Sequence, residues 1–330
     1  MLGKRYEYDG QPLLKLTPAQ LDIKRLIEAK LDSGQYQWEQ VPCCVCGAGD
    51  LEALAAKDRY GFKMTVAVCR GCGLVQTNPR MNADAYTNFY QQHYRALYSP
   101  SQDMAAFFTT RRSKGATIFA FLKEALQSGG LVLEVGCASG GILHAFRERG
   151  CRVMGIDLDA EYVAYGRDQH GLDLRAAALD AFEPEERPNL VLYVHTLEHI
   201  LDPLEELRRI RDLLPDDGLL YVEVPGVKYL HRSYEMDFLR YLQNAHVYHF
   251  SRTSLTNLLH KAGFSIVKSN EWVQVLARKS APVDSTTSDY PAVARYLRRI
   301  ELLRRVLPVS PQTLVATLRR TLRRLRGKQR

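Results

Sequence analysis

Short apolar segments alternate with helical segments over residues 131–224, and this alternation constrains the fold more than any other feature of the 330-residue chain. Apolar strands are expected at 131–135, 151–157, 189–194 and 219–224, with a helix near 141–149 and another starting at Pro203. Strands separated by helices of this length form parallel sheets. The sequence therefore predicts an α/β fold with a doubly wound, Rossmann-like sheet. Two later segments, 264–268 and 272–277, are expected to pair as a hairpin.

Four regions are expected along the chain. Residues 1–80 hold an N-terminal helix and a cysteine-rich module, 81–125 a helical connector or lid, 126–278 the doubly wound domain, and 279–330 a basic helical tail. The first helix is expected over 17–34, where Thr17, Pro18 and Gln20 form a capping-box start. Its predicted apolar stripe consists of Leu21, Leu26, Ile27 and Leu31.

The net charge of +8 is distributed unevenly, because residues 295–330 carry +11 and the rest of the chain −3. A nucleic-acid partner is therefore not expected from the overall charge. The chain has no apolar run of 18 residues and no signal-peptide core at its start, which predicts a cytoplasmic protein with reduced thiols. Leucines and arginines of 314–326 fit an interfacial helix on the inner membrane face. Nucleic-acid binding and a solvated or oligomer-forming helix remain alternatives for this tail.

A glycine turn follows the first strand of the predicted domain. Glu134, Gly136 and Gly140 form a Glu-x-Gly-x-x-x-Gly sequence, and Asp157 ends the next strand. Glycines let the backbone approach a ligand, and an acid at the following strand end can bind ribose hydroxyls. This set, together with Asp180-Ala181, resembles class I S-adenosylmethionine (SAM)-dependent methyltransferases. The resemblance covers roughly residues 115–278, and it implies SAM as cofactor, with Asp157 at the ribose and Asp180 beside the adenine.

A second polar segment, His195-Thr196-Leu197-Glu198-His199, follows the strand at 189–194, where the ligand crevice of a doubly wound fold is expected. It resembles a signature of methyltransferases that act on sugars, quinones and other small molecules. His199 is a candidate acid or base, and His195 and Glu198 are expected to border the cofactor. Ubiquinone O-methyltransferases have two Glu and a His at this spacing, which leaves open a divalent metal site formed by His195, Glu198 and His199. Helix capping is a further alternative for Glu198 and His199.

The segment 243–251 contains His246 and His249 and resembles the Glu-His-x-x-Tyr-Phe-Ser segment of sugar C-methyltransferases. In that resemblance His246 matches the proposed base, whereas Ala245 replaces the Glu and His249 the Tyr. Because the carboxylate partner is missing, O-methylation is as well supported as C-methylation. The aromatic run 89–98 precedes the domain, and its Tyr90 is a weaker candidate for contact with the substrate.

Two Cys-x-x-Cys-Gly knuckles contribute Cys43, Cys46, Cys69 and Cys72, with 22 residues between the pairs. Four thiolates complete a tetrahedral Zn²⁺ shell without an open position, so the metal is expected to be structural. A redox pair is the competing interpretation, but it would not need two knuckles. A zinc ribbon before a methyltransferase domain resembles the sugar C-methyltransferases and related bacterial enzymes of glycan and polysaccharide biosynthesis.

These resemblances imply a SAM-dependent methyltransferase that acts on a sugar, either nucleotide-linked or part of a lipid-linked glycan. The expected base is His246 or His199. Two alternatives stay open: a methyltransferase acting on RNA or protein, and a non-catalytic SAM-binding module.

Overall fold

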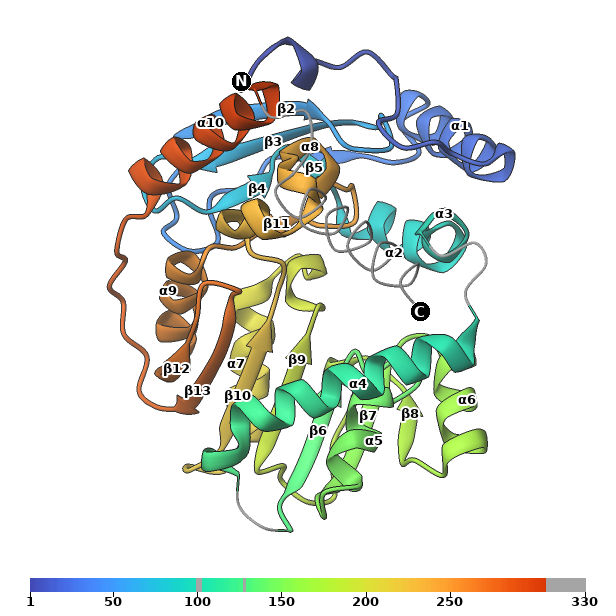
Figure 1. The fold of residues 1–330 in the computed structure, drawn as a ribbon, viewed down its shortest axis with the longest axis vertical. Coiled ribbons are helices and arrows are strands. Elements are labelled where there is room, and N and C mark those ends of the chain that lie inside the picture. Colours follow the sequence, from blue (N-terminus) through green and yellow to red (C-terminus); the bar gives the residue numbers. More distant parts are fainter. Residues whose placement is uncertain (99–102, 127–128, 307–330) are drawn as a thin grey trace, which may run out of the picture.

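The computed structural model describes residues 1–98, 103–126 and 129–306. A seven-stranded sheet forms the lower half of the molecule in Figure 1, with the strand order β12-β13-β10-β9-β6-β7-β8. Its strands are β6 (Leu131–Val135), β7 (Arg152–Asp157), β8 (Leu174–Ala176), β9 (Leu190–Val194), β10 (Leu219–Glu223), β12 (Phe264–Ser269) and β13 (Gln274–Lys279). Strands β10, β9, β6, β7 and β8 run parallel to one another, and β13 pairs antiparallel with β10 and β12. The predicted α/β doubly wound sheet is confirmed, as is the hairpin at its edge.

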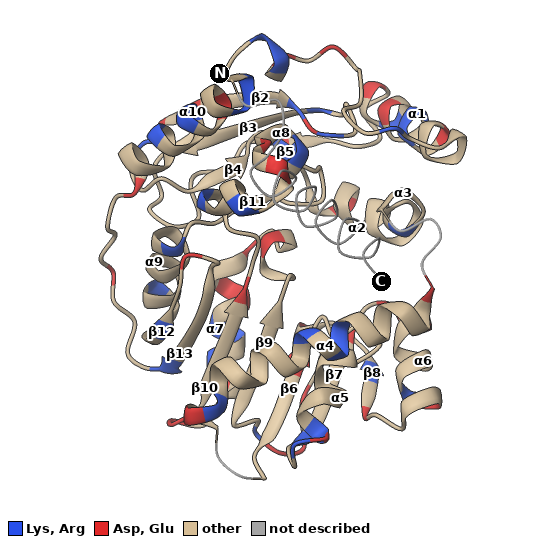
Figure 2. Cartoon of the chain, viewed as in Figure 1, with Lys and Arg blue, Asp and Glu red and all other residues tan. Residues whose placement is uncertain are grey.

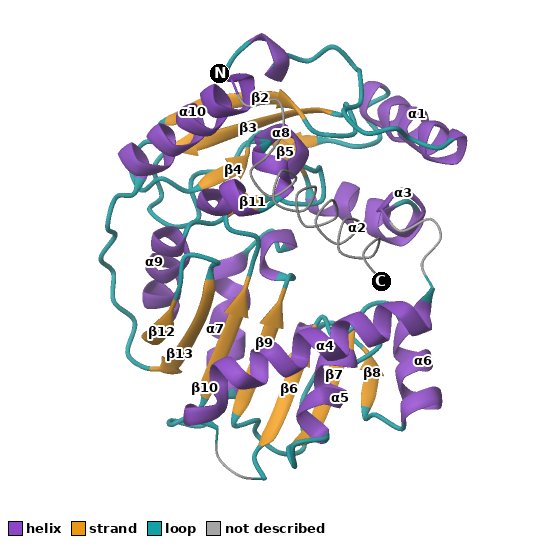
Figure 3. Ribbon diagram, viewed as in Figure 1, coloured by secondary structure: helices purple, strands orange, loops and turns teal. Residues whose placement is uncertain are grey.

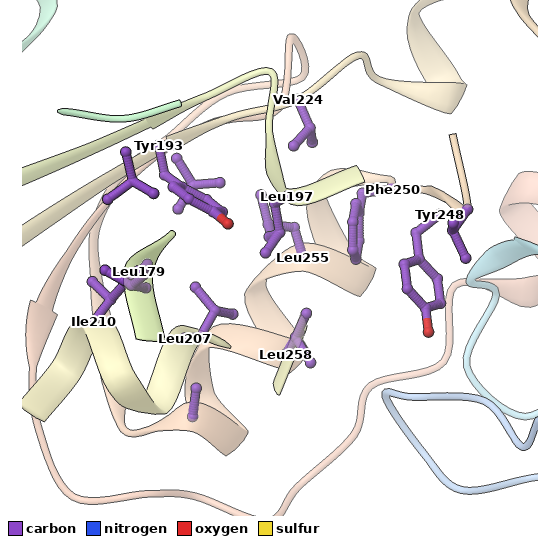
Figure 4. Close-up of a cluster of buried hydrophobic side chains, with 14 of the residues drawn as sticks. Leu179, Tyr193, Leu197, Leu207, Ile210, Val224, Tyr248, Phe250, Leu255 and Leu258 are labelled. Carbon is purple, nitrogen blue, oxygen red and sulfur yellow. The ribbon is translucent and has the colours of Figure 1, made fainter. Parts of the chain in front are cut away.

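Helices cover both faces of this sheet (Figure 3). One face packs on α4 (Met104–Leu122) and α5 (Gly141–Arg147), with Ile118 and Phe146 in the same core as Leu192. The other face packs on α7 (Pro203–Leu213) and α9 (Arg252–Ala262), whose core side chains surround Tyr193 and Leu197 in Figure 4. Alternate residues of each strand thus point into different cores, as the two-residue period of a strand requires.

The N-terminal sheet lies at the carboxyl ends of β9 and β10 (Figure 1). It contains β2 (Leu51–Lys57), β3 (Lys63–Cys69), β4 (Val75–Thr77) and β11 (Tyr248–His249), in the order β11-β4-β3-β2 and antiparallel throughout. Strand β11 lies about 170 residues beyond its partner β4 in the chain, and Tyr248 pairs with Gln76. The cysteine-rich segment is therefore completed by residues from the second histidine cluster.

The remaining helices are divided between the two halves of the molecule. They are α1 (Pro18–Asp32), α2 (Ala83–Gln92), α3 (Tyr94–Tyr98), α6 (Ala160–His170), α8 (Phe238–Tyr241), α10 (Tyr290–Val306) and the single turns η1 (Lys4–Tyr6), η2 (Lys123–Ala125), η3 (Leu179–Ala181), η4 (Leu197–His199), η5 (Val227–Arg232) and η6 (Tyr234–Met236), of which α6, η2, η3 and η4 belong to the lower half. Strands β1 (Trp38–Glu39) and β5 (Arg80–Met81) form a separate antiparallel pair.

Helix α1 starts as predicted, with the Thr17 side chain accepting from the Gln20 amide in a capping box. The predicted apolar stripe is wrong at Leu26, which is 48% exposed. Ile23, Ile27 and Leu31 face the core instead, because four-residue steps keep side chains on one helix face and Leu26 is one residue off this series.

Helix α10 places arginines at the surface (Figure 2) and packs its apolar face against the upper sheet, with Val293, Leu297 and Ile300 in a core shared with Val66. The Tyr6 hydroxyl donates to the Glu301 carboxylate at 2.9 Å, which ties the N-terminus to this helix. The predicted tail helix at 314–326 lies outside the described residues. Within the described ranges, no helix combines the length and apolarity that crossing a bilayer requires.

Candidate functional site

The glycine turn connects β6 to α5. Gly136 and Gly140 both have left-handed backbone conformations, with φ values of 76° and 74°. A Cβ atom at Gly136 would lie 2.4 Å from the Thr196 Oγ1, and one at Gly140 would lie 2.7 Å from Leu172. Only glycine fits such positions without strain. The turn is therefore pressed directly against the segment that carries the histidines.

Asp157 ends β7 beside this turn. Its two carboxylate oxygens accept from the backbone amides of Ala138 at 2.7 Å and Asp159 at 2.8 Å. Burial raises the pKa of this carboxyl above its ordinary value, although the amides oppose the shift. Each oxygen has a lone pair left for a ligand hydroxyl. The next residue, Leu158, is 77% exposed and offers an apolar surface beside the carboxylate.

Asp180 lies after β8, the edge strand next to β7. Its carboxylate is 62% exposed and lies 3.8 Å from the Arg209 guanidinium of α7. Its contact with a ligand is thus less well supported by the structure than that of Asp157.

Glu134 is fully buried under the glycine turn, and both of its carboxylate oxygens have no hydrogen-bond partner among the described residues. The Arg111 guanidinium lies 3.7 Å away. Burial raises the pKa of Glu134 to about 8, and repulsion from Asp157 adds to the shift. Arg111 opposes this shift, but its guanidinium is too far away for a hydrogen bond, so the carboxyl oxygens can still accept one from a polar ligand group.

His195 leaves the end of β9 with a left-handed φ of 57°. Its ring nitrogens lie 3.7 Å from the Glu198 carboxylate and 3.5 Å from the Glu223 carboxylate. Burial disfavours the charged ring, but the two carboxylates prevail and raise the pKa of His195 to about 9. His195 is therefore a cation at neutral pH.

Glu223 is not among the site residues predicted from the sequence, because it lies within the apolar strand expected at 219–224. It ends β10, and its carboxylate accepts from Tyr221 at 2.7 Å and from Gln274 at 3.1 Å, and it also pairs with the Lys114 ammonium. Its position at the end of the strand could have indicated a role in the site, because a carboxylate at the carboxyl end of a parallel strand faces the ligand crevice.

His199 is held by its Nδ1 atom, which lies 2.9 Å from the Ala245 carbonyl and 2.8 Å from the Tyr90 hydroxyl. A carbonyl oxygen can only accept, so Nδ1 carries the proton and Nε2 keeps its lone pair. The Tyr90 hydroxyl donates to the same carbonyl at 3.2 Å. Burial lowers the pKa of His199, so its ring is neutral near pH 7 and able to accept a proton at Nε2.

His246 faces His199, with ring centroids 4.8 Å apart and the rings nearly perpendicular. Its Nε2 lies 3.9 Å from the Glu198 carboxylate, which is buried and has no hydrogen-bond partner among the described residues. The ligand atoms of Glu198, His199 and His246 lie within 4.8 Å of one another, a set able to approach a metal ion. The sequence-based metal hypothesis had His195 in the place of His246.

His249 belongs to β11 and is fully buried against Tyr241, with ring centroids 5.0 Å apart. Burial lowers the pKa of His249 to about 3, so this ring stays neutral. Strand pairing with β4 fixes His249 relative to the N-terminal sheet, and the Thr77 hydroxyl at the end of β4 donates to the His246 carbonyl at 3.3 Å.

The four cysteines of the two knuckles converge. The Cys43 and Cys72 sulfurs lie 3.5 Å apart, as do those of Cys46 and Cys69. Bonds of about 2.3 Å in a Zn²⁺ tetrahedron place sulfurs about 3.8 Å apart, so the spacing fits a metal ion. The group consists of these four cysteines and does not include Cys44.

Residues 107–269 match the family model described as "Methyltransferase domain". Among curated proteins, C-methyltransferase NovU of Streptomyces niveus is 29% identical over 212 residues, which cover 62% of this chain and 47% of that protein. The ubiquinone biosynthesis O-methyltransferase of Rhodopseudomonas palustris (strain HaA2) is 31% identical over 100 residues, or 29% of this chain and 40% of that enzyme. The chain thus spans less than half the length of these relatives.

Among solved structures, the 1,6-didemethyltoxoflavin-N1-methyltransferase of Burkholderia thailandensis, with bound 1,6-didemethyltoxoflavin and S-adenosylhomocysteine, is 19% identical. The alignment covers 69% of this chain and 99% of that one, with a TM-score of 0.48.

Proposed function

We propose that this protein transfers the methyl group of SAM to a sugar, nucleotide-linked or in a lipid-linked glycan, because residues 107–269 match the methyltransferase-domain model. One observation carries this proposal. The glycine turn touches Thr196 of the segment that holds His199, so a ligand on the turn lies next to a neutral histidine with a free lone pair.

The residues at the turn fit SAM. The backbone at Gly136 and Gly140 admits a ligand closely, Asp157 has lone pairs for two ribose hydroxyls, and Leu158 offers an apolar surface for the base. The orphan carboxyl of Glu134 gains a polar partner there. SAM supplies an electrophilic methyl group, so the protein has to hold the two reactants in line and remove a proton.

His199 is the residue best placed to remove that proton. Its Nδ1–H is held by the Ala245 carbonyl, which orients the Nε2 lone pair away from this loop. Burial lowers the pKa of His199, so the ring is unprotonated near pH 7 and its Nε2 lone pair can take the proton. A hydroxyl acceptor gives an O-methyl product. A carbon acceptor must lie beside a carbonyl group, so that removal of the proton forms an enolate.

The surroundings of His199 favour a polar acceptor. Buried polar atoms of Glu198 and His246, whose ligand atoms lie within 4.8 Å of those of His199, have no hydrogen-bond partners among the described residues. Tyr94 contacts the His199 ring at 6.2 Å between centroids and adds an aromatic wall. A sugar, with many hydroxyl groups, satisfies such atoms, whereas an apolar acceptor leaves them unpaired.

The names of the relatives support both product types. A C-methyltransferase and ubiquinone biosynthesis O-methyltransferases match this chain at similar identity, and both matches are partial. We therefore keep O- and C-methylation within the proposal.

The four-cysteine group is proposed to hold a structural Zn²⁺. The knuckles supply four sulfurs at a spacing that fits the ion, and a closed thiolate shell leaves no position for substrate. The ion would fix the sheet that carries β11, and through it the second histidine cluster.

The lipid-linked arm of the proposal is supported by α10. Arg295, Arg298 and Arg299 are exposed, and Leu302 and Val306 beside them are 62% and 69% exposed. Such a surface suits the inner face of an anionic membrane. Sedimentation with anionic vesicles but not with zwitterionic ones is expected, and equal recovery with both would contradict it.

The central experiment incubates the protein with methyl-labelled SAM and fractions of a bacterial extract: nucleotide sugars, lipid-linked glycans, and RNA with protein. Label in a sugar fraction is expected, and it should be lost with His199→Gln but retained with His260→Gln, a half-buried histidine of α9. Label only in RNA or protein would overturn the sugar assignment. SAM binding without label in any fraction would favour the non-catalytic alternative.

A further inference from the structure

A chain of polar contacts connects the N-terminal sheet to His246. Arg59 lies in the loop between β2 and β3, and its Nη2 donates to the Oε1 of Gln243. The Nε2 of the same amide contacts the Nε2 of His246. Arg59 is thus connected through Gln243 to His246 in one relay, although Arg59 lies 184 positions before Gln243 in the chain.

The donor and acceptor chemistry of this relay admits one arrangement. An arginine side chain has only donors, so the amide oxygen of Gln243 must face Arg59 and the NH₂ group must face His246. The NH₂ group can only donate, so the Nε2 of His246 must accept. The proton of the neutral ring is therefore on Nδ1.

The loop that carries Arg59 is rigidly attached to the segment before His246. The buried Asp58 carboxylate accepts from the backbone amides of Tyr60 and Asn244, each at 2.9 Å. The Arg59 amide donates to the Leu242 carbonyl at 3.2 Å, and its Nη1 donates to the Arg240 carbonyl at 3.2 Å. These backbone contacts with residues 240, 242 and 244 hold the loop and the Arg59 guanidinium in place.

The Nδ1 of His246 is buried and has no hydrogen-bond partner among the described residues. We propose that His246 acts as a hydrogen-bond donor, through Nδ1–H, to an oxygen of the methyl acceptor, and that Arg59 and Gln243 are positioning residues that set this tautomer. This inference rests on the proposed function, and it leaves His199 as the base. The two facing histidines thus have opposite roles: one keeps a lone pair at Nε2, and the other presents a proton at Nδ1.

A base at His199 and a hydrogen-bond donor at His246 suit both a hydroxyl acceptor and a carbon acceptor. An oxygen that carries negative charge after proton removal, whether alkoxide or enolate, is stabilised by a donor fixed in advance.

The test is long-range ¹H–¹⁵N NMR of protein labelled with ¹⁵N-histidine, in which the coupling pattern shows which ring nitrogen bears the proton. The His246 signals are identified by their loss in His246→Asn. Wild-type protein near pH 7 is expected to show His246 with the proton on Nδ1. A proton on Nε2, or on both nitrogens, would overturn the proposal.

Variants then test the relay. Arg59→Gln frees the Gln243 amide to rotate, so a mixture of tautomers is expected, whereas Arg59→Lys keeps a pure donor and should keep the wild-type pattern. Arg240→Gln is the matched control, because its side chain pairs with Glu235 instead. An unchanged pattern in Arg59→Gln would refute the role of Arg59.

If Arg59→Gln does not fold, as judged by SAM binding in calorimetry, Gln243→Met removes the donor to Nε2 and should mix the tautomers. An unmixed pattern there would refute the relay. The NMR readout needs no turnover, so it separates this inference from the proposed function. An Nδ1–H pattern without methyl transfer would refute the function alone, and methyl transfer with an Nε2–H pattern would refute the relay alone.

Discussion

Replacing Glu134 by Gln tests how a buried carboxyl group with a raised pKa affects the stability of the folded protein. Glu134 is fully buried, its oxygens have no hydrogen-bond partner among the described residues, and its pKa is raised from 4.5 to about 8. A carboxyl group with a raised folded-state pKa lowers stability as pH rises through the interval between its unfolded and folded values. The unliganded wild-type protein should therefore lose stability from pH 5 to pH 8. Glu134→Gln should lack the share of this loss that comes from the titration of Glu134.

The magnitude follows from the interval. One pKa unit corresponds to about 1.4 kcal/mol, and roughly 2.5 units of the shift act between pH 5 and pH 8. The stability of Glu134→Gln relative to wild type should thus rise by about 3.5 kcal/mol over this range. The buried amide of the variant also lacks partners and costs about 1–3 kcal/mol, but this cost does not depend on pH. The slope, and not the absolute difference, is the diagnostic quantity.

Urea unfolding followed by circular dichroism at pH 5, 6, 7 and 8 measures this slope. Glu148→Gln is the matched control, because Arg112 lowers the pKa of that surface carboxyl and its titration lies below the range. A difference between wild type and Glu134→Gln that stays constant with pH would refute the reasoning. It would mean that Glu134 is ionised in the folded protein, with Arg111 as an effective partner.

Three further predictions use other parts of the structure. Gly136→Ala should weaken SAM binding at least about tenfold in calorimetry, because an alanine in the left-handed conformation costs about 1–2 kcal/mol and its Cβ would lie 2.4 Å from Thr196. The control is Gly150→Ala, which should bind SAM normally, because Gly150 also has a positive φ of 86° but has open space around it. Cys46→Ser should lose bound zinc in elemental analysis and lower the melting temperature by about 5 °C or more, and a wild-type melting temperature unchanged by a strong chelator would contradict this. His195→Gln should remove a stabilisation of the folded protein that is complete below pH 6.5 and lost as pH rises through about 9. Because the His195 side chain is 39% exposed, water screens this stabilisation to about 1 kcal/mol. Equal pH dependence of unfolding in the wild type and the variant would count against this prediction.

The sequence alone determined the doubly wound sheet and the grouping of the four cysteines. Both follow from local patterns: short apolar segments that alternate with helical segments, and two Cys-x-x-Cys-Gly turns whose geometry is set within five residues. Glu134, Gly136, Gly140 and Asp157 could likewise be proposed from one strand-turn-helix unit and the end of the next strand. Hydrophobic and steric rules act over such short distances without knowledge of the rest of the chain.

Only the tertiary structure decided how the two histidine segments meet. Nothing in the sequence shows that Tyr248 pairs with Gln76, or that this pairing brings His246 to face His199. The same holds for Arg59, which reaches Gln243 across 184 positions of the chain. The proton on each ring is set by which groups surround it: a carbonyl at the Nδ1 of His199, and an amide donor at the Nε2 of His246. Residue identity gives a histidine its range of functions, and the neighbours that folding supplies select between base and donor.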